Sequence, residues 1–169
     1  IEHKVRLEGL KPGGKYFYRV CAQEILYYGA YKKIMGNTQR TDFYSFCLPQ
    51  EKQTDFTALV FNDLHRDAET IREMSELAEK IPHDFVLFNG DCIPDPSSRD
   101  DAIHMLHRLT SAFHTEQTPA FFVRGNHEIR GFHSAALPSL LDQPGGKTYG
   151  AFSWGETRFV ILDCGEDKS

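Results

Sequence analysis

The stretch DFVLFNGD, residues 84–91, predicts a strand that is buried on both faces and ends in a polar turn. Its apolar core, Phe85 to Phe88, has no polar face, which is typical of a central strand in a parallel sheet. FTALVFND, residues 56–63, and PAFFVRGN, residues 119–126, have the same form. The chain therefore contains three candidate strands that each run into a polar turn.

Amphipathic helical patterns lie between these strands. Residues 67–81 space their apolar side chains at intervals of three and four and begin with acidic residues. Residues 97–116 form a second such pattern, with Ser97 or Ser98 as the N-cap. The alternation of strands and helices implies right-handed crossovers and a largely parallel sheet, so we predict an α/β fold.

Shorter elements follow the third strand. Residues 133–141 predict a short helix that is interrupted by Pro138. Residues 149–165 predict a β-hairpin that turns at Gly155-Glu156, with a strand over residues 158–162. These elements extend the α/β layer beyond its βαβαβ part.

The first part of the chain has a different pattern. Residues 3–10, 16–22 and 43–49 alternate apolar and polar side chains, which predicts three strands. LKPGGKY, residues 10–16, resembles the tyrosine corner of immunoglobulin-like sandwiches. We expect residues 1–50 to be the last strands of a fibronectin type III-like β-sandwich, whose earlier strands lie elsewhere.

Charge and composition separate the same two parts, with the polar stretch PQEKQTD as the linker. Residues 1–50 carry 8 Lys and Arg against 4 Asp and Glu, whereas residues 51–169 carry 11 against 20 and seven of the eight His. An acidic, His-rich domain suits metal binding and disfavours nucleic acid. The hydrophobic fraction of 40% is that of a globular protein, and no apolar run is long enough to cross a membrane.

The four cysteines suggest no metal site of their own. Cys21 and Cys47 fall in two predicted strands and could pair, while Cys92 and Cys164 each follow an Asp at a strand end. Without a Cys-x-x-C motif, a Cys-based zinc site is not expected, and buried thiols are the simpler interpretation. A disulfide in a sandwich would favour a secreted or periplasmic location.

Metal-binding residue types follow all three predicted strands. They occur as NDLH at residues 62–65, NGD at residues 89–91 and GNHE at residues 125–128. In open α/β sheets the carboxyl ends of the strands form the site, so the three stretches should converge. Carboxylate, imidazole and amide oxygen are suitable ligands for Zn, Mn or Fe. Polar turns would explain each stretch singly, but not the ordered set.

The ordered set Asp-x-His, Gly-Asp and Gly-Asn-His-Glu resembles the calcineurin-like metallophosphoesterases, over about residues 55–165. The resemblance implies two metal ions, Zn, Mn or Fe, and phosphate-ester hydrolysis with a metal-bound hydroxide as nucleophile. It places Asp63 and His65 on the first ion, Asp91 between the ions and Asn126 on the second. His127 would act on the leaving oxygen as the catalytic residue.

Three charged residues lie within or beside this motif. Arg124 and Arg130 are candidates for binding the substrate phosphate or for pairing with Glu128, and we favour pairing. Glu128 is expected to hold the loop by hydrogen bonds.

A fibronectin-like domain before a phosphoesterase resembles the plan of purple acid phosphatases. Those enzymes have Gly where His65 stands and a Tyr ligand shortly after the bridging Asp. The corresponding stretch here, GDCIPD at residues 90–95, has no Tyr, so a ferric–tyrosinate site is not expected. Asp95 only loosely matches the second Asp that many relatives have in this loop.

The family's remaining His ligands, including a Gly-His-x-His loop, do not occur after Leu162. We therefore expect a fragment of a longer polypeptide, with another segment or a second chain completing both domains. On its own it should bind metal weakly and show near-background activity. The predicted function is metal-dependent phosphatase or phosphodiesterase activity. One alternative is a non-catalytic adhesion module. The other is a nuclease-type member of the same superfamily, which the acidic charge balance of residues 51–169 disfavours.

Overall fold

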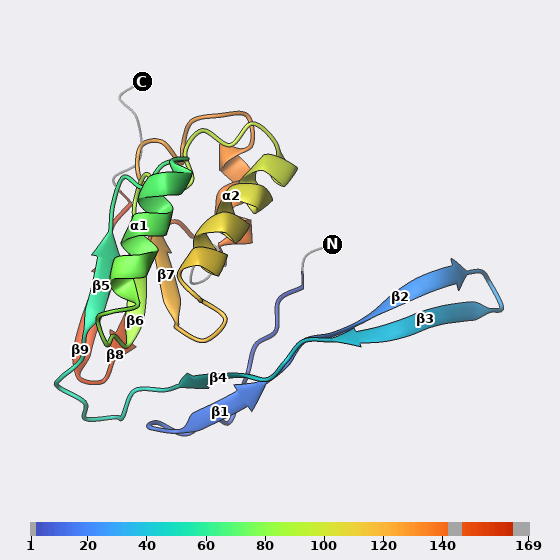
Figure 1. Cartoon of the computed structure of the whole chain (residues 1–169), viewed down its shortest axis with the longest axis horizontal. Coiled ribbons are helices and arrows are strands. Elements are labelled where there is room, and N and C mark those ends of the chain that lie inside the picture. The colour runs from blue at the N-terminus through green and yellow to red at the C-terminus, as the bar shows by residue number, and fades with distance from the viewer. Residues whose placement is uncertain (1–2, 142–146, 164–169) are drawn as a thin grey trace.

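A computed structural model describes residues 3–141 and 147–163, which form a parallel sheet layer and a preceding β region (Figure 1). The parallel sheet has the order β5-β6-β7. Its strands are β5 (Ala58–Phe61), β6 (Phe85–Asn89) and β7 (Ala120–Val123), each lying within a predicted strand. The predicted α/β class, with a metallophosphoesterase-type parallel layer after a β region, is confirmed.

Two helices, α1 (Ala68–Ala78) and α2 (Arg99–Ala112), form the crossovers between these strands (Figure 1). Both begin at side chains that cap free backbone N–H groups. Asp67 accepts from the N–H two residues on at 3.0 Å, and Ser98 accepts from the N–H three residues on at 3.1 Å. Ser98 is one of the two caps that the sequence predicts for α2.

Strand β6 lies at the centre of the core because both of its faces are covered. Val86 and Phe88 have no exposed surface and pack in one cluster with side chains of α1 and α2. Phe85 points the other way and meets rings of the hairpin formed by β8 (Gly150–Trp154) and β9 (Thr157–Ile161), at centroid distances of 4.8 to 6.0 Å. The hairpin turns where the sequence predicts.

Short helices follow β7, as predicted for residues 133–141. They are the 3-10 helix η1 (Ser134–Ala136) and α3 (Leu137–Leu140). Leu137 is 1% exposed and anchors them in a second core cluster beside α2. Among the described helices, none is long and apolar enough to cross a bilayer.

The β region consists of two antiparallel ladders. Strand β1 (Lys15–Tyr18) pairs with β4 (Tyr44–Cys47), and β2 (Cys21–Tyr28) pairs with β3 (Lys33–Arg40) in a long hairpin that projects from the rest of the chain (Figure 1). The strand predicted over residues 16–22 is therefore divided, because the chain changes pairing partner between β1 and β2. The mixed, polar sequence of β3 lacks a clear alternation, and that strand was not predicted.

The strand predicted over residues 3–10 is wrong. In the structure this segment is not in a strand, and its alternating apolar side chains Val5 and Leu7 are 80% and 53% exposed. A strand requires a neighbour for its backbone N–H and C=O groups. None of the described strands provides one for these residues.

The hydrogen bond expected of a tyrosine corner is present. The backbone N–H of Lys11 donates to the Tyr16 hydroxyl at 2.5 Å, which ties the turn to the start of β1. The fibronectin type III-like sandwich and the division at residues 1–50 and 51–169 stay predictions.

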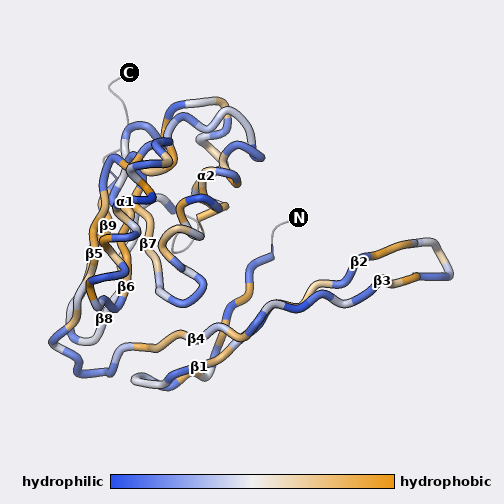
Figure 2. Tube along the Cα trace, in the orientation of Figure 1, coloured by the Kyte–Doolittle hydropathy of each residue, from blue (hydrophilic) through white to orange (hydrophobic). Residues whose placement is uncertain are grey.

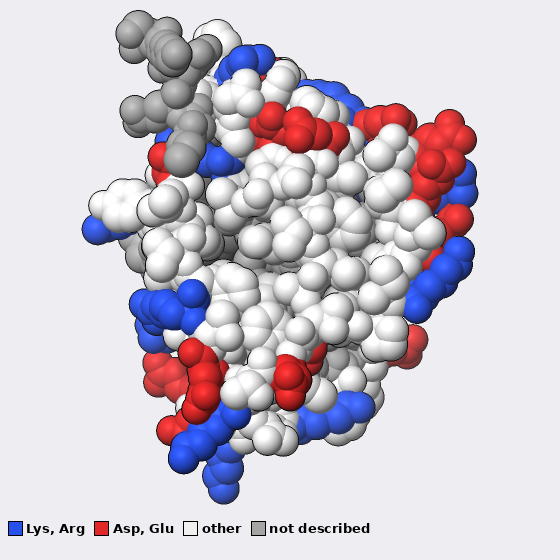
Figure 3. Space-filling model, turned by 90° about the vertical axis from the view of Figure 1, so that its left-hand side faces the viewer, with Lys and Arg blue, Asp and Glu red and all other residues white. Residues whose placement is uncertain are grey.

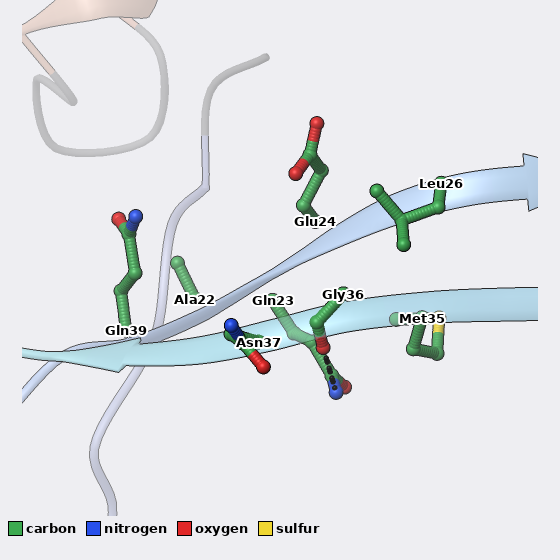
Figure 4. A pocket seen from close by; sticks show the side chains of 8 residues that line it. All are labelled: Ala22, Gln23, Glu24, Leu26, Met35, Gly36, Asn37 and Gln39. Carbon is green, nitrogen blue, oxygen red and sulfur yellow. Dashed lines mark hydrogen bonds between the residues drawn. The ribbon is translucent and has the colours of Figure 1, made fainter.

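Hydrophobic residues gather in the outer half of the β2–β3 hairpin (Figure 2). The large apolar side chains exposed there are Ile25, Leu26, Tyr27, Tyr28, Ile34 and Met35. Nearer its base, Gln23 Nε2 donates to the Gly36 carbonyl at 2.9 Å across the ladder (Figure 4). A two-stranded ribbon that exposes both faces has little tertiary support.

Cys21 and Cys47, which could have paired, do not, and the simpler interpretation of them as buried thiols is wrong as well. Both thiols are free and exposed, so neither is a buried thiol. They lie in different ladders, where Cys21 is opposite Arg40 and Cys47 is opposite Lys15. Cys92 is free and buried, as expected, and Cys164 lies outside the described residues.

Candidate metal centre

The polar stretches that follow the three parallel strands meet at one edge of the sheet. Two backbone hydrogen bonds join the first stretch to the second. The N–H of Asp63 donates to the Gly90 carbonyl at 3.1 Å, and the N–H of His65 donates to the Asp91 carbonyl at 2.9 Å. The predicted convergence of these stretches is therefore present in the structure.

The second and third stretches approach so closely that both need glycine. A Cβ atom on Gly90, which has a φ of 94°, would lie 3.1 Å from the Gly125 Cα. A Cβ atom on Gly125 would collide with the Asp91 carboxylate and lie 2.8 Å from its backbone nitrogen. The two loops thus pack backbone against backbone, which brings Asp91 next to the GNHE stretch.

Four residues of the site have left-handed backbone conformations that are unusual for side chains with a Cβ. Asp63, His65, Asp91 and Asp95 have φ values of 54°, 51°, 55° and 46°. Each such conformation costs about 1 kcal/mol or more, so the surrounding contacts must hold it. Backbone strain of this kind is common at functional sites. Here it sets the directions of side chains in the loops after β5 and β6.

A cluster of three possible metal ligands lies between these loops. His65, Asp91 and His127 each offer one ligand atom, and these atoms are all within 4.8 Å of one another. Asp63 Oδ1 lies 3.7 Å from His65 Nε2. Imidazole nitrogen and carboxylate oxygen are donors that suit Zn, Mn and Fe, so the chemistry of the set fits a transition metal.

Asn126 lies between Asp91 and Arg130. With its amide nitrogen toward Asp91, it donates to Oδ2 at 2.9 Å and its oxygen accepts from Arg130 Nη2 at 2.8 Å. The opposite orientation would present the amide oxygen to the cluster, as a metal ligand must. The ligand role of Asn126 stays a prediction, and its amide lies beside the Asp91 carboxylate.

His127 has an acidic partner, Asp95, that was not predicted. Its Nδ1 lies 3.1 Å from Asp95 Oδ2, and the two residues are joined again by the Asp95 N–H, which donates to the His127 carbonyl at 3.0 Å. A carboxylate can only accept, so Nδ1 donates and Nε2 remains for chemistry. The available signal was a second acid in the same loop as Asp91.

Glu128 is the structural centre of the site. It is 2% exposed, and its carboxylate accepts four backbone N–H groups at 2.7 to 2.8 Å, those of Asp91, Cys92, Ile93 and Gly125. The predicted role of Glu128 in holding the loops by hydrogen bonds is confirmed. A single carboxylate therefore fixes the ends of both β6 and β7.

The favoured pairing of Arg124 or Arg130 with Glu128 is wrong, because backbone donors already occupy both Glu128 oxygens. Arg124 instead donates through Nε to both carboxylate oxygens of Asp163 at 2.9 Å. Arg130 contacts His127, with the Arg130 Nη1 atom 3.4 Å from the His127 Nε2 atom. The predicted contact of these two arginines with a substrate phosphate stays a prediction.

Residues 56–162 match the family model of the calcineurin-like phosphoesterases. The chain belongs to the calcineurin-like phosphoesterase family. Its fold is similar to that of a purple acid phosphatase isolated from yellow lupin (Lupinus luteus) seeds, with a TM-score of 0.60 and 16% identity. That match covers 91% of this chain, which spans 31% of the lupin chain. No curated protein sequence matches the chain.

Cys92 directly follows Asp91 and is buried beneath the candidate site. It is 3% exposed, and its thiol donates to the Gly90 carbonyl at 3.3 Å. Burial raises the pKa of the thiol to about 12. Cys92 is therefore a neutral, buried packing residue at physiological pH.

Asp101, in the first turn of α2, forms an ion pair with Arg66. Arg66 directly follows His65, the last residue of the first polar stretch. The Arg66 guanidinium, followed by the N–H and hydroxyl of Ser97, holds the pKa of Asp101 well below its usual value of 3.8. Because the folded state favours the ionised form, its stabilisation is present above the usual pKa and is lost as the pH falls below it.

We expect Asp101→Asn to lower the free energy of unfolding by about 1 kcal/mol at neutral pH, a modest value because the pair is partly exposed. The difference from the unsubstituted protein should shrink as the pH falls below about 4, because the unfolded state then takes up a proton at this position while the folded state stays ionised until the pH is lower still. Urea unfolding across this pH range measures it. Asp100→Asn, at an exposed neighbouring position, is the control, and a difference that persists unchanged at low pH would contradict the assignment.

Proposed function

We propose that the protein hydrolyses phosphate esters at a dinuclear metal site on the carboxyl edge of the parallel sheet. The observation that carries this proposal is the cluster of His65, Asp91 and His127, whose ligand atoms lie within 4.8 Å of one another in a calcineurin-like phosphoesterase. Asp63 and His65 would hold one ion, Asp91 would bridge, and Asn126 would hold the other. The ions would supply Lewis-acid charge at the phosphoryl group.

His127, in its doubly protonated form, would give the proton on Nε2 to the leaving oxygen and keep the proton on Nδ1. Its bond to Asp95 orients the ring and favours the protonated form of Nδ1, so Nε2 is the nitrogen that meets the substrate. Arg130, next to Nε2, would bind a phosphate oxygen. Its guanidinium could then exchange its contact with the Asn126 amide for one with the substrate.

The proposed substrate is a small phosphate ester rather than a long nucleic acid. Residues 51–169 are acidic, and on the face shown in Figure 3 the Lys and Arg side chains are interspersed with Asp and Glu around an uncharged centre. Polynucleotide binding relies on gathered positive charge. This supports a monoesterase or a small-molecule diesterase over a nuclease.

Hydrolysis of p-nitrophenyl phosphate and of its bis ester, with Zn, Mn or Fe added, tests the proposal. We expect slow, metal-dependent release of p-nitrophenol that His127→Ala lowers by about 100-fold, because the leaving oxygen loses its proton donor. His104→Ala, at an exposed position of α2, is the matched control. Release that survives both chelation and His127→Ala would contradict the proposal.

A further inference from the structure

Arg66 connects the two loops that carry the candidate site residues. It directly follows His65 in the first loop and reaches across to the loop after β6. There its Nη2 donates to the carbonyls of Pro94 and Asp95, each at 3.2 Å. Arg66 thus donates a hydrogen bond to the backbone of Asp95, whose side chain contacts His127.

The guanidinium that makes these bonds is itself held by α2. Nη1 and Nη2 of Arg66 donate to the two carboxylate oxygens of Asp101, each at 3.0 Å. Asp101 is fixed in turn by the N–H and hydroxyl of Ser97, at 2.9 and 2.8 Å. At the other end, Arg108 donates to the Arg66 carbonyl at 3.1 Å. These contacts give the planar guanidinium group of Arg66 one defined orientation.

The side chain of Asp95 needs such support because it is too exposed to be held in place by burial. Its side chain is 47% exposed, and its backbone has a left-handed φ of 46° that few surroundings favour. An exposed carboxylate on a strained loop would otherwise sample several positions. The backbone of Asp95 packs closely against Gly131, and its described hydrogen bonds are those with His127 and the one that its carbonyl accepts from Arg66.

We propose that Arg66, clamped by Asp101, is a positioning residue that keeps Asp95 on His127 Nδ1 and thereby leaves His127 Nε2 directed to the reacting group. The catalytic meaning of this inference rests on the proposed function. A surface ion pair with no further role would need only the carboxylate contact, which contributes little at partly exposed sites. The two additional carbonyl contacts require the guanidinium fork, which Lys cannot reproduce.

The test is NMR of the metal-free protein, labelled with ¹⁵N in its histidines, at a fixed pH of about 8, where imidazole is neutral. In the unsubstituted protein we expect one dominant His127 tautomer with a protonated, slowly exchanging Nδ1. In Arg66→Lys, exchange of that proton should accelerate at least about tenfold, and the two ring nitrogens should shift toward a mixture of tautomers. Asp101→Asn should produce a smaller change in the same direction.

Arg72→Lys is the matched control, because Arg72 is also an exposed arginine with a carboxylate partner, at 2.7 Å from Glu76 on α1. It should leave the His127 signals unchanged, and circular dichroism should show that every variant is folded. Identical His127 spectra in Arg66→Lys and the unsubstituted protein would overturn the inference while leaving any hydrolysis intact. Hydrolysis that survives both chelation and His127→Ala would instead overturn the proposed function and leave the spectroscopic result standing.

Discussion

Replacing Glu128 with Gln is expected to lower the free energy of unfolding by about 3–5 kcal/mol. The Glu128 carboxylate is buried and accepts four backbone N–H groups from the loops after β6 and β7. An amide has one acceptor oxygen, and its NH₂ group would face N–H donors that then have no acceptor. Removing the charge also weakens each hydrogen bond that remains.

Urea unfolding followed by circular dichroism measures this loss. Glu156→Gln, at an exposed position in the β8–β9 turn, is the matched control and should change the free energy of unfolding by less than about 0.5 kcal/mol. The loops that Glu128 holds also carry Asp91 and Gly125, so metal affinity should fall together with stability. A Glu128→Gln protein as stable as the control variant would show that the loops do not depend on this carboxylate.

Replacing Asp91 with Asn is expected to lower the affinity for Zn or Mn by more than about 100-fold. Asp91 is the one carboxylate in the cluster of His65, Asp91 and His127, and it is the proposed bridge between two ions. Asn has nearly the same shape and can still accept the His127 N–H, which Asp91 Oδ1 accepts at 2.8 Å. The loss should therefore come from the missing charge rather than from unfolding.

Isothermal titration with each metal measures this affinity. Asp42→Asn, in the β region, removes one negative charge away from the site and should leave the affinity unchanged. Thermal unfolding of both variants shows whether the fold is retained. If Asp91→Asn binds metal as tightly as the unsubstituted protein, the cluster at the sheet edge is not the metal centre.

The parallel layer could be predicted from the sequence because its signals are local. An apolar run such as Phe85 to Phe88 can bury its side chains only if both faces of the sheet are covered at that strand. The amphipathic patterns between the strands require helices, and right-handed crossovers then place all three strand ends at one edge. This is why Asp63, Asp91 and Asn126 were expected to converge before their contacts were known.

The β region could be predicted less well, because strands depend on partners that are remote in sequence. The alternation of Val5 and Leu7 is a genuine strand pattern, yet no described strand pairs with it. Cys21 and Cys47 each fall in a strand, but the pairing register separates them. Periodicity shows that a segment can form a strand and leaves its neighbour undetermined.

The sequence by itself determined the order of the elements, the family and the residue types at the strand ends. Tertiary structure alone decided the hydrogen-bond partners within the site: Asp95 with His127, Arg124 with Asp163, and Glu128 with four backbone N–H groups. These partners depend on loops in which several residues have left-handed φ values. Such conformations are unfavourable locally and exist because contacts from distant parts of the chain stabilise them, so local sequence patterns do not reveal them.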